Sequence, residues 1–151
     1  MKKLVGLLMI IIISAGVVSG CRGETSFKKG YVYKVDTGDK ISIMIDSSDK
    51  YNITSKVPFE ISKDGKVLTT GAFIEASAYE DYVEVVEKDE KASMIQSGSS
   101  KGLEYIMWSY DDKEYNYAIK IEDSKTGIIL GNTVSAESAE ECFNRMEITV
   151  K

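Results

Sequence analysis

The sequence contains no histidine, and it has one proline, one tryptophan and two cysteines among 151 residues. The lack of histidine excludes catalytic triads with a histidine base and metal sites with imidazole ligands. One proline and 12 glycines exclude collagen-like and low-complexity chains. The remaining composition, 43% hydrophobic and 28% charged residues, is typical of one globular domain with its own core.

The first 20 residues form a segment that differs from the rest of the chain. Lys2 and Lys3 precede an almost wholly apolar stretch from 4 to 18, and small residues follow it. These are the three parts of a secretory signal peptide. As a helix, the apolar stretch reaches about 23 Å, which is less than the hydrocarbon core of roughly 30 Å. We therefore expect a signal peptide over residues 1–20 rather than a permanent membrane helix.

The residues at the end of this segment, Val18, Ser19, Gly20 and Cys21, resemble the lipobox of bacterial lipoproteins. The resemblance implies that the Cys21 thiol is lipidated with diacylglycerol, that cleavage follows Gly20, and that the protein is anchored to the outward, extracytoplasmic face of a bacterial cell membrane. Two or more acyl chains give stable anchoring, because each buried CH₂ contributes about 0.8 kcal/mol. The alternative is an uncleaved anchor helix in which Cys21 is an unmodified thiol.

Processing changes the charge of the chain. Removal of Lys2 and Lys3 with the leader leaves 17 basic and 24 acidic side chains, a formal charge of −7. Nucleic acid repels such a domain, so no nucleic-acid partner is expected.

Residues 21–29 are predicted to be an acylated tether and 30–151 a single domain. If Cys21 is acylated, Cys142 has no partner and no intramolecular disulfide forms.

Alternation of apolar and polar residues predicts strands at 31–36 and 41–46, and Asp64 with Gly65 marks a hairpin turn. Further strands are expected at 57–62, 67–70, 92–97, 103–110, 114–122, 128–130 and 148–150, with a loop over Gly98–Gly102.

Two segments change to the helical period. Residues 77–88 are predicted to be a helix that begins with a capping box of Ser77 and Glu80, and a second helix follows a cap at Ser135. The order of elements predicts an α+β fold, a mostly antiparallel sheet of about six to eight strands with two helices packed on it. This order resembles that of the PsbP-like α+β sandwiches, which implies a twisted sheet covered by helices.

Two short motifs match those of penicillin-recognising enzymes. Lys125, Thr126 and Gly127 spell K-T-G, and Ser47 with Lys50 fits S-x-x-K. However, S-D-N is missing, and the S-x-x-K lies in a polar turn rather than at the start of a buried helix. We therefore interpret both segments as turns.

Metal and thiol chemistry have little support in the sequence. Asp111, Asp112 and Glu114 lack the alternate spacing and the glycine of a calcium loop, so we interpret them as a solvated hairpin tip and expect no metal and no cofactor. Cys142 lies on the apolar face of the second helix, where burial would raise its pKa, and no histidine is present to activate it.

Five aromatic residues lie on two neighbouring predicted strands: Tyr105, Trp108, Tyr110, Tyr115 and Tyr117. Most are expected in the core, but any that reach the solvated face would form an interaction surface for a peptide, a glycan or an envelope protein. We therefore hypothesise a non-catalytic binding or interaction module. The alternatives are a small envelope hydrolase with carboxylates such as Asp111, Glu114 or Glu122, and a structural spacer.

Overall fold

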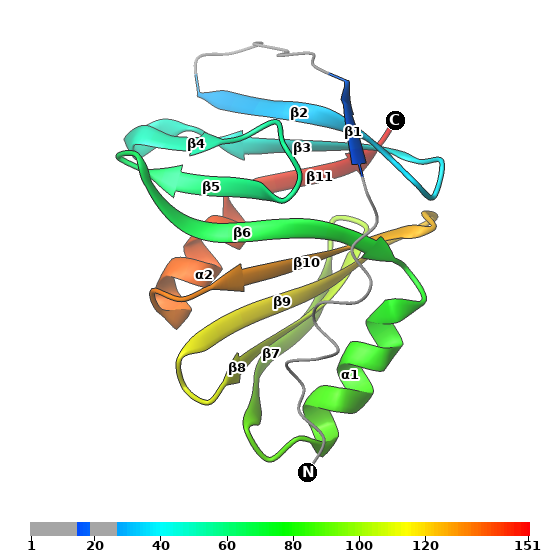
Figure 1. Ribbon diagram of the computed structural model, residues 1–151, viewed down its shortest axis with the longest axis vertical. Helices are drawn as coiled ribbons and strands as arrows, with labels where there is room; N and C mark the ends of the chain where they lie inside the picture. Colours follow the sequence, from blue (N-terminus) through cyan, green and yellow to red (C-terminus); the bar gives the residue numbers. More distant parts are fainter. Residues whose placement is uncertain (1–14, 19–26) are drawn as a thin grey trace.

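The strands form two antiparallel sheets (Figure 1). The computed structural model describes residues 15–18 and 27–151. The smaller sheet has the strand order β1 (Ala15–Val18), β2 (Lys28–Val35), β3 (Lys40–Asp46) and β11 (Met146–Val150). The larger sheet has the order β4 (Tyr51–Ile53), β5 (Phe59–Lys63), β6 (Lys66–Glu75), β10 (Thr126–Asn132), β9 (Glu114–Ile121), β8 (Leu103–Tyr110) and β7 (Ala92–Ser100).

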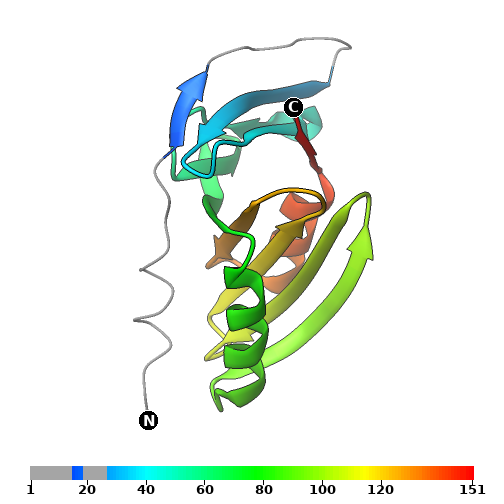
Figure 2. The same ribbon diagram turned by 90° about the vertical axis from the view of Figure 1, so that its right-hand side faces the viewer.

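The two helices, α1 (Ala78–Lys88) and α2 (Ala136–Asn144), pack on opposite faces of the larger sheet (Figure 2). On one face, α1 covers what we call the α1 core. Its residues are Ala72, Ile74, Ala78, Tyr79, Tyr82, Val86, Ile106, Trp108, Ala118 and Ile129. On the other face, α2 and the smaller sheet enclose a larger core that includes Tyr33, Phe59, Phe73 and Tyr117. The larger sheet is thus buried on both sides over much of its width.

Alternate residues of β8 and β9 enter different cores. Trp108 of β8 pairs with Asn116 of β9 on the α1 side, whereas Met107 pairs with Tyr117 on the side of the larger core. A side chain's position along the strand therefore decides which helix it contacts.

One glycine of β6 permits close packing in the larger core. A Cβ atom at Gly71 would lie 2.2 Å from Phe59 Cζ and 2.8 Å from Leu130 Cδ2. The ring of Phe59 therefore occupies the space above Gly71, and it lies 5.9 Å from the ring of Phe73 between centroids. Rings at this spacing stabilise the core beyond their area burial.

The predicted α+β class with a mostly antiparallel sheet and two helices is confirmed, but the strand number is too low and the single sheet is wrong. Eleven strands are present among the described residues, and β11 pairs with β3 instead of joining the larger sheet. A pattern of buried faces identifies strands, but it does not say which strand pairs with which.

Three local predictions also need correction. The capping box is absent, because Ser77 has helical φ and ψ and makes no side-chain cap hydrogen bond. The expected loop at Gly98–Gly102 is shorter, since β7 continues to Ser100 and the turn consists of Lys101 and Gly102 with positive φ. The strand β2 begins at Lys28, inside the segment predicted as tether. By contrast, the cap of α2 is confirmed, since Ser135 Oγ accepts a hydrogen bond from Ser138 N at 3.0 Å.

Candidate functional site

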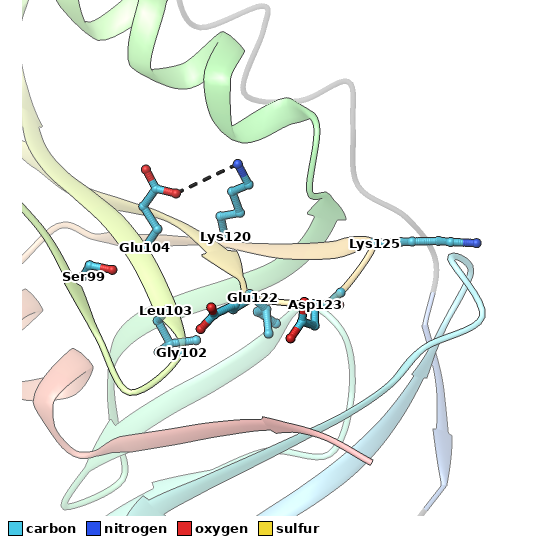
Figure 3. Close-up of a pocket in the computed structure, with 10 residues that line it drawn as sticks. Ser99, Gly102, Leu103, Glu104, Lys120, Glu122, Asp123 and Lys125 are labelled. Carbon is cyan, nitrogen blue, oxygen red and sulfur yellow. Dashed lines mark ion pairs between the residues drawn. The ribbon is translucent and has the colours of Figure 1, made fainter.

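A hollow of about 470 Å³ lies where the β7–β8 and β9–β10 turns meet (Figure 3). Its volume falls in the range of small-molecule sites. The lining residues are Ser99, Gly102, Leu103, Glu104, Lys120, Ile121, Glu122, Asp123, Ser124 and Lys125. The lining carries both charge signs, with three carboxylates and two ammonium groups.

The central ammonium group of the hollow, that of Lys120, is already paired. Its Nζ lies 3.2 Å from Glu80 Oε1 and 3.9 Å from Glu104 Oε2, and Figure 3 shows the Lys120 side chain pointing toward Glu104. The same nitrogen lies 5.8 Å from the ring centroid of Tyr79, and burial together with the two carboxylates raises the pKa of Tyr79 to about 12. Lys120 therefore links β9 to α1 and β8, while Lys125 points away from the other labelled residues.

The K-T-G segment beside the hollow has a structural role. Asp39, in the turn between β2 and β3, accepts hydrogen bonds at Oδ2 from Ser124 Oγ (2.7 Å), Lys125 N (2.9 Å) and Thr126 Oγ1 (3.0 Å). These bonds, the Ser124 hydroxyl foremost, hold the pKa of Asp39 below its usual value. The prediction of a turn is wrong for two of the three residues, because Thr126, which is fully buried, and Gly127 are the first residues of β10. The hydrogen bonds to Asp39 join the start of this strand to the smaller sheet.

The five predicted aromatic residues do not share one surface. Trp108 lies in the α1 core and Tyr117 in the larger core, and both are buried. Tyr105 packs on the side of the larger core, 4.8 Å from the ring of Phe143 in α2, so it forms part of the packing around Tyr117. Tyr110 and Tyr115 are partly exposed near one end of the β8–β9 hairpin. The structure therefore leaves three partly exposed tyrosines on two faces of the sheet.

The carboxylates of the alternative hydrolase hypothesis are not brought together. Asp111 and Glu114 lie exposed at the β8–β9 turn, where Asp111 pairs with Lys113 at 3.6 Å. Glu122 follows the other end of β9, about eight residues or roughly 25 Å along the strand, and lines the hollow. Glu104 and Asp123 are therefore the carboxylates that share a lining with Glu122.

Cys142 is fully buried in the larger core, and burial raises the pKa of its thiol. This agrees with the prediction that burial on the apolar face of the second helix raises the pKa of this thiol. Among the described residues, no group of three or more aspartate, glutamate and cysteine side chains is arranged to hold a metal ion.

A cluster around Arg145 was missed by sequence reasoning. Its Nη1 donates to the carbonyl oxygens of Asp46 and Ser48, both at 3.2 Å, and Nη2 donates to Asp49 Oδ2 at 2.9 Å and to Glu141 Oε1 at 3.3 Å. The guanidinium also stacks on Tyr51, 3.9 Å from the ring centroid. Nothing in the sequence indicates this cluster, because its members come from segments almost 100 residues apart.

A second hollow of about 390 Å³ adjoins this cluster. Its lining consists of Asp46, Glu137, Glu140, Glu141, Asn144 and Arg145. Because the single cation among them is engaged by backbone and carboxylate oxygens, the hollow has no free positive group to bind an anion. The glutamates occupy the exposed face of α2.

Cys21, with Ser19 and Gly20 of the lipobox, lies outside the described residues. Within the described part of the chain, no helix is both long and apolar enough to span a bilayer.

Comparison with known proteins gives no match: no family model, no curated protein and no solved structure matches this chain. The resemblances to bacterial lipoproteins and to PsbP-like sandwiches therefore stay predictions from the sequence.

Proposed function

We propose that this chain is a lipoprotein of the bacterial cell envelope, anchored in the membrane through Cys21, whose folded domain is a non-catalytic binding or interaction module. The observation that carries the proposal is the tetrapeptide Val18–Cys21 at the end of a basic and apolar leader. The partner class that fits is an envelope protein or peptide outside the cytoplasm. An anionic bilayer repels the acidic domain, so the domain's contacts are expected with such a partner rather than with the bilayer surface.

The chemistry of the described side chains supports a binding role over catalysis. The Cys142 thiol is buried, Lys120 is paired, and Asp111 and Glu114 lie at the opposite end of β9 from Glu122, so these groups form no nucleophile with an adjacent base. The surfaces available for contact are the three partly exposed tyrosines and the mixed-charge hollow at the turns.

The experiment has two parts, one for the anchor and one for the role. Mass spectrometry of the full-length protein extracted from its native membrane should find residues 1–20 removed and Cys21 acylated, and a Cys21→Ser variant should lose the lipid. A bare Cys21 with the leader attached would contradict the anchor. Cross-linking in intact cells should join the wild-type protein to another component of the envelope. If no cross-link to another component formed, the interaction role would be contradicted.

The second candidate is a small carboxylate-dependent hydrolase, and it keeps one supporting observation. Glu104, Glu122 and Asp123 line the same hollow. A hydrolase of this kind would lose activity on envelope polymers in Glu122→Gln, whereas a binding module would show no turnover in either form.

A further inference from the structure

The strand β7 lies at the free edge of the larger sheet (Figure 2). It is nine residues long and pairs with β8 on one side, and no strand of the described chain pairs with it on the other. The outer backbone N–H and C=O groups of such an edge are ready to pair with another extended strand.

The other sheet edges are shorter or carry charge. The edge strands β4, β1 and β11 have three, four and five residues respectively. Removal of residues 1–20 would take β1 away and leave the eight-residue β2 as an edge, but β2 carries Lys28, Lys29 and Lys34. Natural sheets also protect long edges with charged residues or proline, yet residues 92–100 include neither. One bulge at Ile95 interrupts β7, and beyond it Gln96–Ser100 pairs regularly with β8.

Exposed apolar side chains coincide with this edge. Met94 is 43% exposed and Ile95 is 47% exposed, and they are neighbours in β7. The other large apolar side chains with comparable exposure among residues 27–151 are Phe27, Val67, Val134 and Val150, each on a separate segment. The edge strand is thus the place where unpaired backbone and adjacent apolar side chains occur together.

The charges at the two ends of β7 identify a fitting occupant. Asp89 and Glu90, with Lys91, precede the strand and give a net charge of −1, whereas Lys101 follows it and gives +1. When two copies of β7 pair antiparallel, the acidic end of each copy lies opposite Lys101 of the other. A parallel pair would place like ends together, so the strand is self-complementary in the antiparallel direction.

We infer that β7 is a self-association edge, at which a second copy of this chain adds its own β7 antiparallel and extends the larger sheet across a twofold axis. Such an isologous contact uses the same surface on both subunits. A single pair of nine-residue strands buries less than the standard interface of about 1,600 Å², so the dimer is weak in solution. Tethering to one membrane would raise the local concentration, and in this respect the inference rests on the proposed function.

The test is sedimentation equilibrium of the full-length protein in density-matched detergent over a concentration series. The wild type should show a mass that rises with concentration toward the dimer. Ile95→Lys should weaken the dimer about tenfold or more, because it adds a charge to the edge and removes an apolar contact. Val67→Lys is the matched control, since Val67 is 43% exposed on β6, and it should leave the dimer unchanged.

A charge swap tests the antiparallel direction. Glu90→Lys and Lys101→Glu should each weaken the dimer, and the double variant should restore it, because opposite charges again face each other. Circular dichroism should show that all variants are folded. Glu90 and Lys101 are exposed, so the charge-swap variants still test the dimer if Ile95→Lys does not fold.

Three results would overturn the inference: a monomeric wild type up to its solubility limit, a dimer that Ile95→Lys and the single swaps leave intact, or a β7-dependent dimer that the double swap does not restore. None of these would touch lipidation of Cys21 or cross-linking to another envelope component. Failure here is therefore distinguishable from failure of the proposed function.

Discussion

Two buried tyrosines offer a test of the packing at the level of one oxygen atom. Tyr33 is 0% and Tyr117 is 1% exposed, and burial raises the pKa of both hydroxyls. The Tyr33 hydroxyl donates to the carbonyl oxygen of Thr54 at 2.8 Å, whereas the Tyr117 hydroxyl oxygen is buried without a hydrogen-bond partner in the structure. Replacement of each by phenylalanine removes one oxygen and keeps the ring.

The two substitutions should differ in their effect on stability. Tyr33→Phe should lower the free energy of unfolding by about 1 kcal/mol, because it removes a partly buried hydrogen bond to the carbonyl oxygen of Thr54. Tyr117→Phe should be neutral or should raise the free energy of unfolding by up to about 1 kcal/mol, because it removes an unpaired buried hydroxyl. The ring of Tyr117 keeps its contact with Phe143, 4.4 Å away between centroids, in the variant.

Urea unfolding of both variants, followed by circular dichroism, measures the difference directly. Each variant serves as the control for the other, since both remove the same atom from a buried ring. If Tyr117→Phe destabilised the protein as much as Tyr33→Phe, the Tyr117 hydroxyl would have a partner and the reasoning would be refuted.

Three further predictions follow from the contacts described above. Arg145→Ala should lower the free energy of unfolding by about 2–3 kcal/mol, and Arg145→Lys should recover less than half of this loss, since an ammonium cannot make the forked contacts; a lysine variant as stable as wild type would contradict this. Gly71→Ala should cost about 2–4 kcal/mol in urea unfolding because its Cβ would overlap Phe59, whereas Gly131→Ala, whose nearest contact is Asn116 Oδ1 at 3.4 Å, should stay within about 0.5 kcal/mol; equal effects would exclude the overlap. Asp39 has a lowered pKa in the folded state, so its stabilisation is present above the unfolded pKa of about 3.9 and is lost as pH falls through the lower folded value. Urea unfolding at several pH values should therefore show a steeper acid loss for wild type than for Asp39→Asn, and parallel curves would count against the three hydrogen bonds.

Much of the fold could be predicted because the local period identifies each kind of element. The alternation of Tyr115, Tyr117, Ile119 and Ile121 with smaller or polar residues predicts the strand β9, although Asn116 and Ala118 are buried as well, and the helical period of Tyr79, Tyr82 and Val86 matches the buried face of α1. These signals come from neighbouring residues, so a single sequence contains them.

The features that the sequence did not reveal depend on distant contacts. The short strand β4 forms by pairing with β5 and packs beneath Arg145, and β11 pairs with β3 across about 100 residues. The sequence also did not decide whether Trp108 and Tyr117 are both buried. Alternation shows that neighbouring residues of a strand face opposite sides of the sheet, but not whether each side is covered. The candidate site shares this limit, since the hollow is lined by two turns that meet only in the folded chain.

The alternation of β8 and β9 between two cores restricts where this protein can acquire new chemistry. A shift of one residue in the pairing of these strands would put the indole of Trp108 where the thioether of Met107 fits. Packing against α1 and packing against α2 therefore require the same register. A polar substitution in the middle of either strand meets a dry interior whichever way it points. Within the described part of the chain, variation in function is therefore directed to the rim of the larger sheet and to its turns, while the centre is constrained by packing.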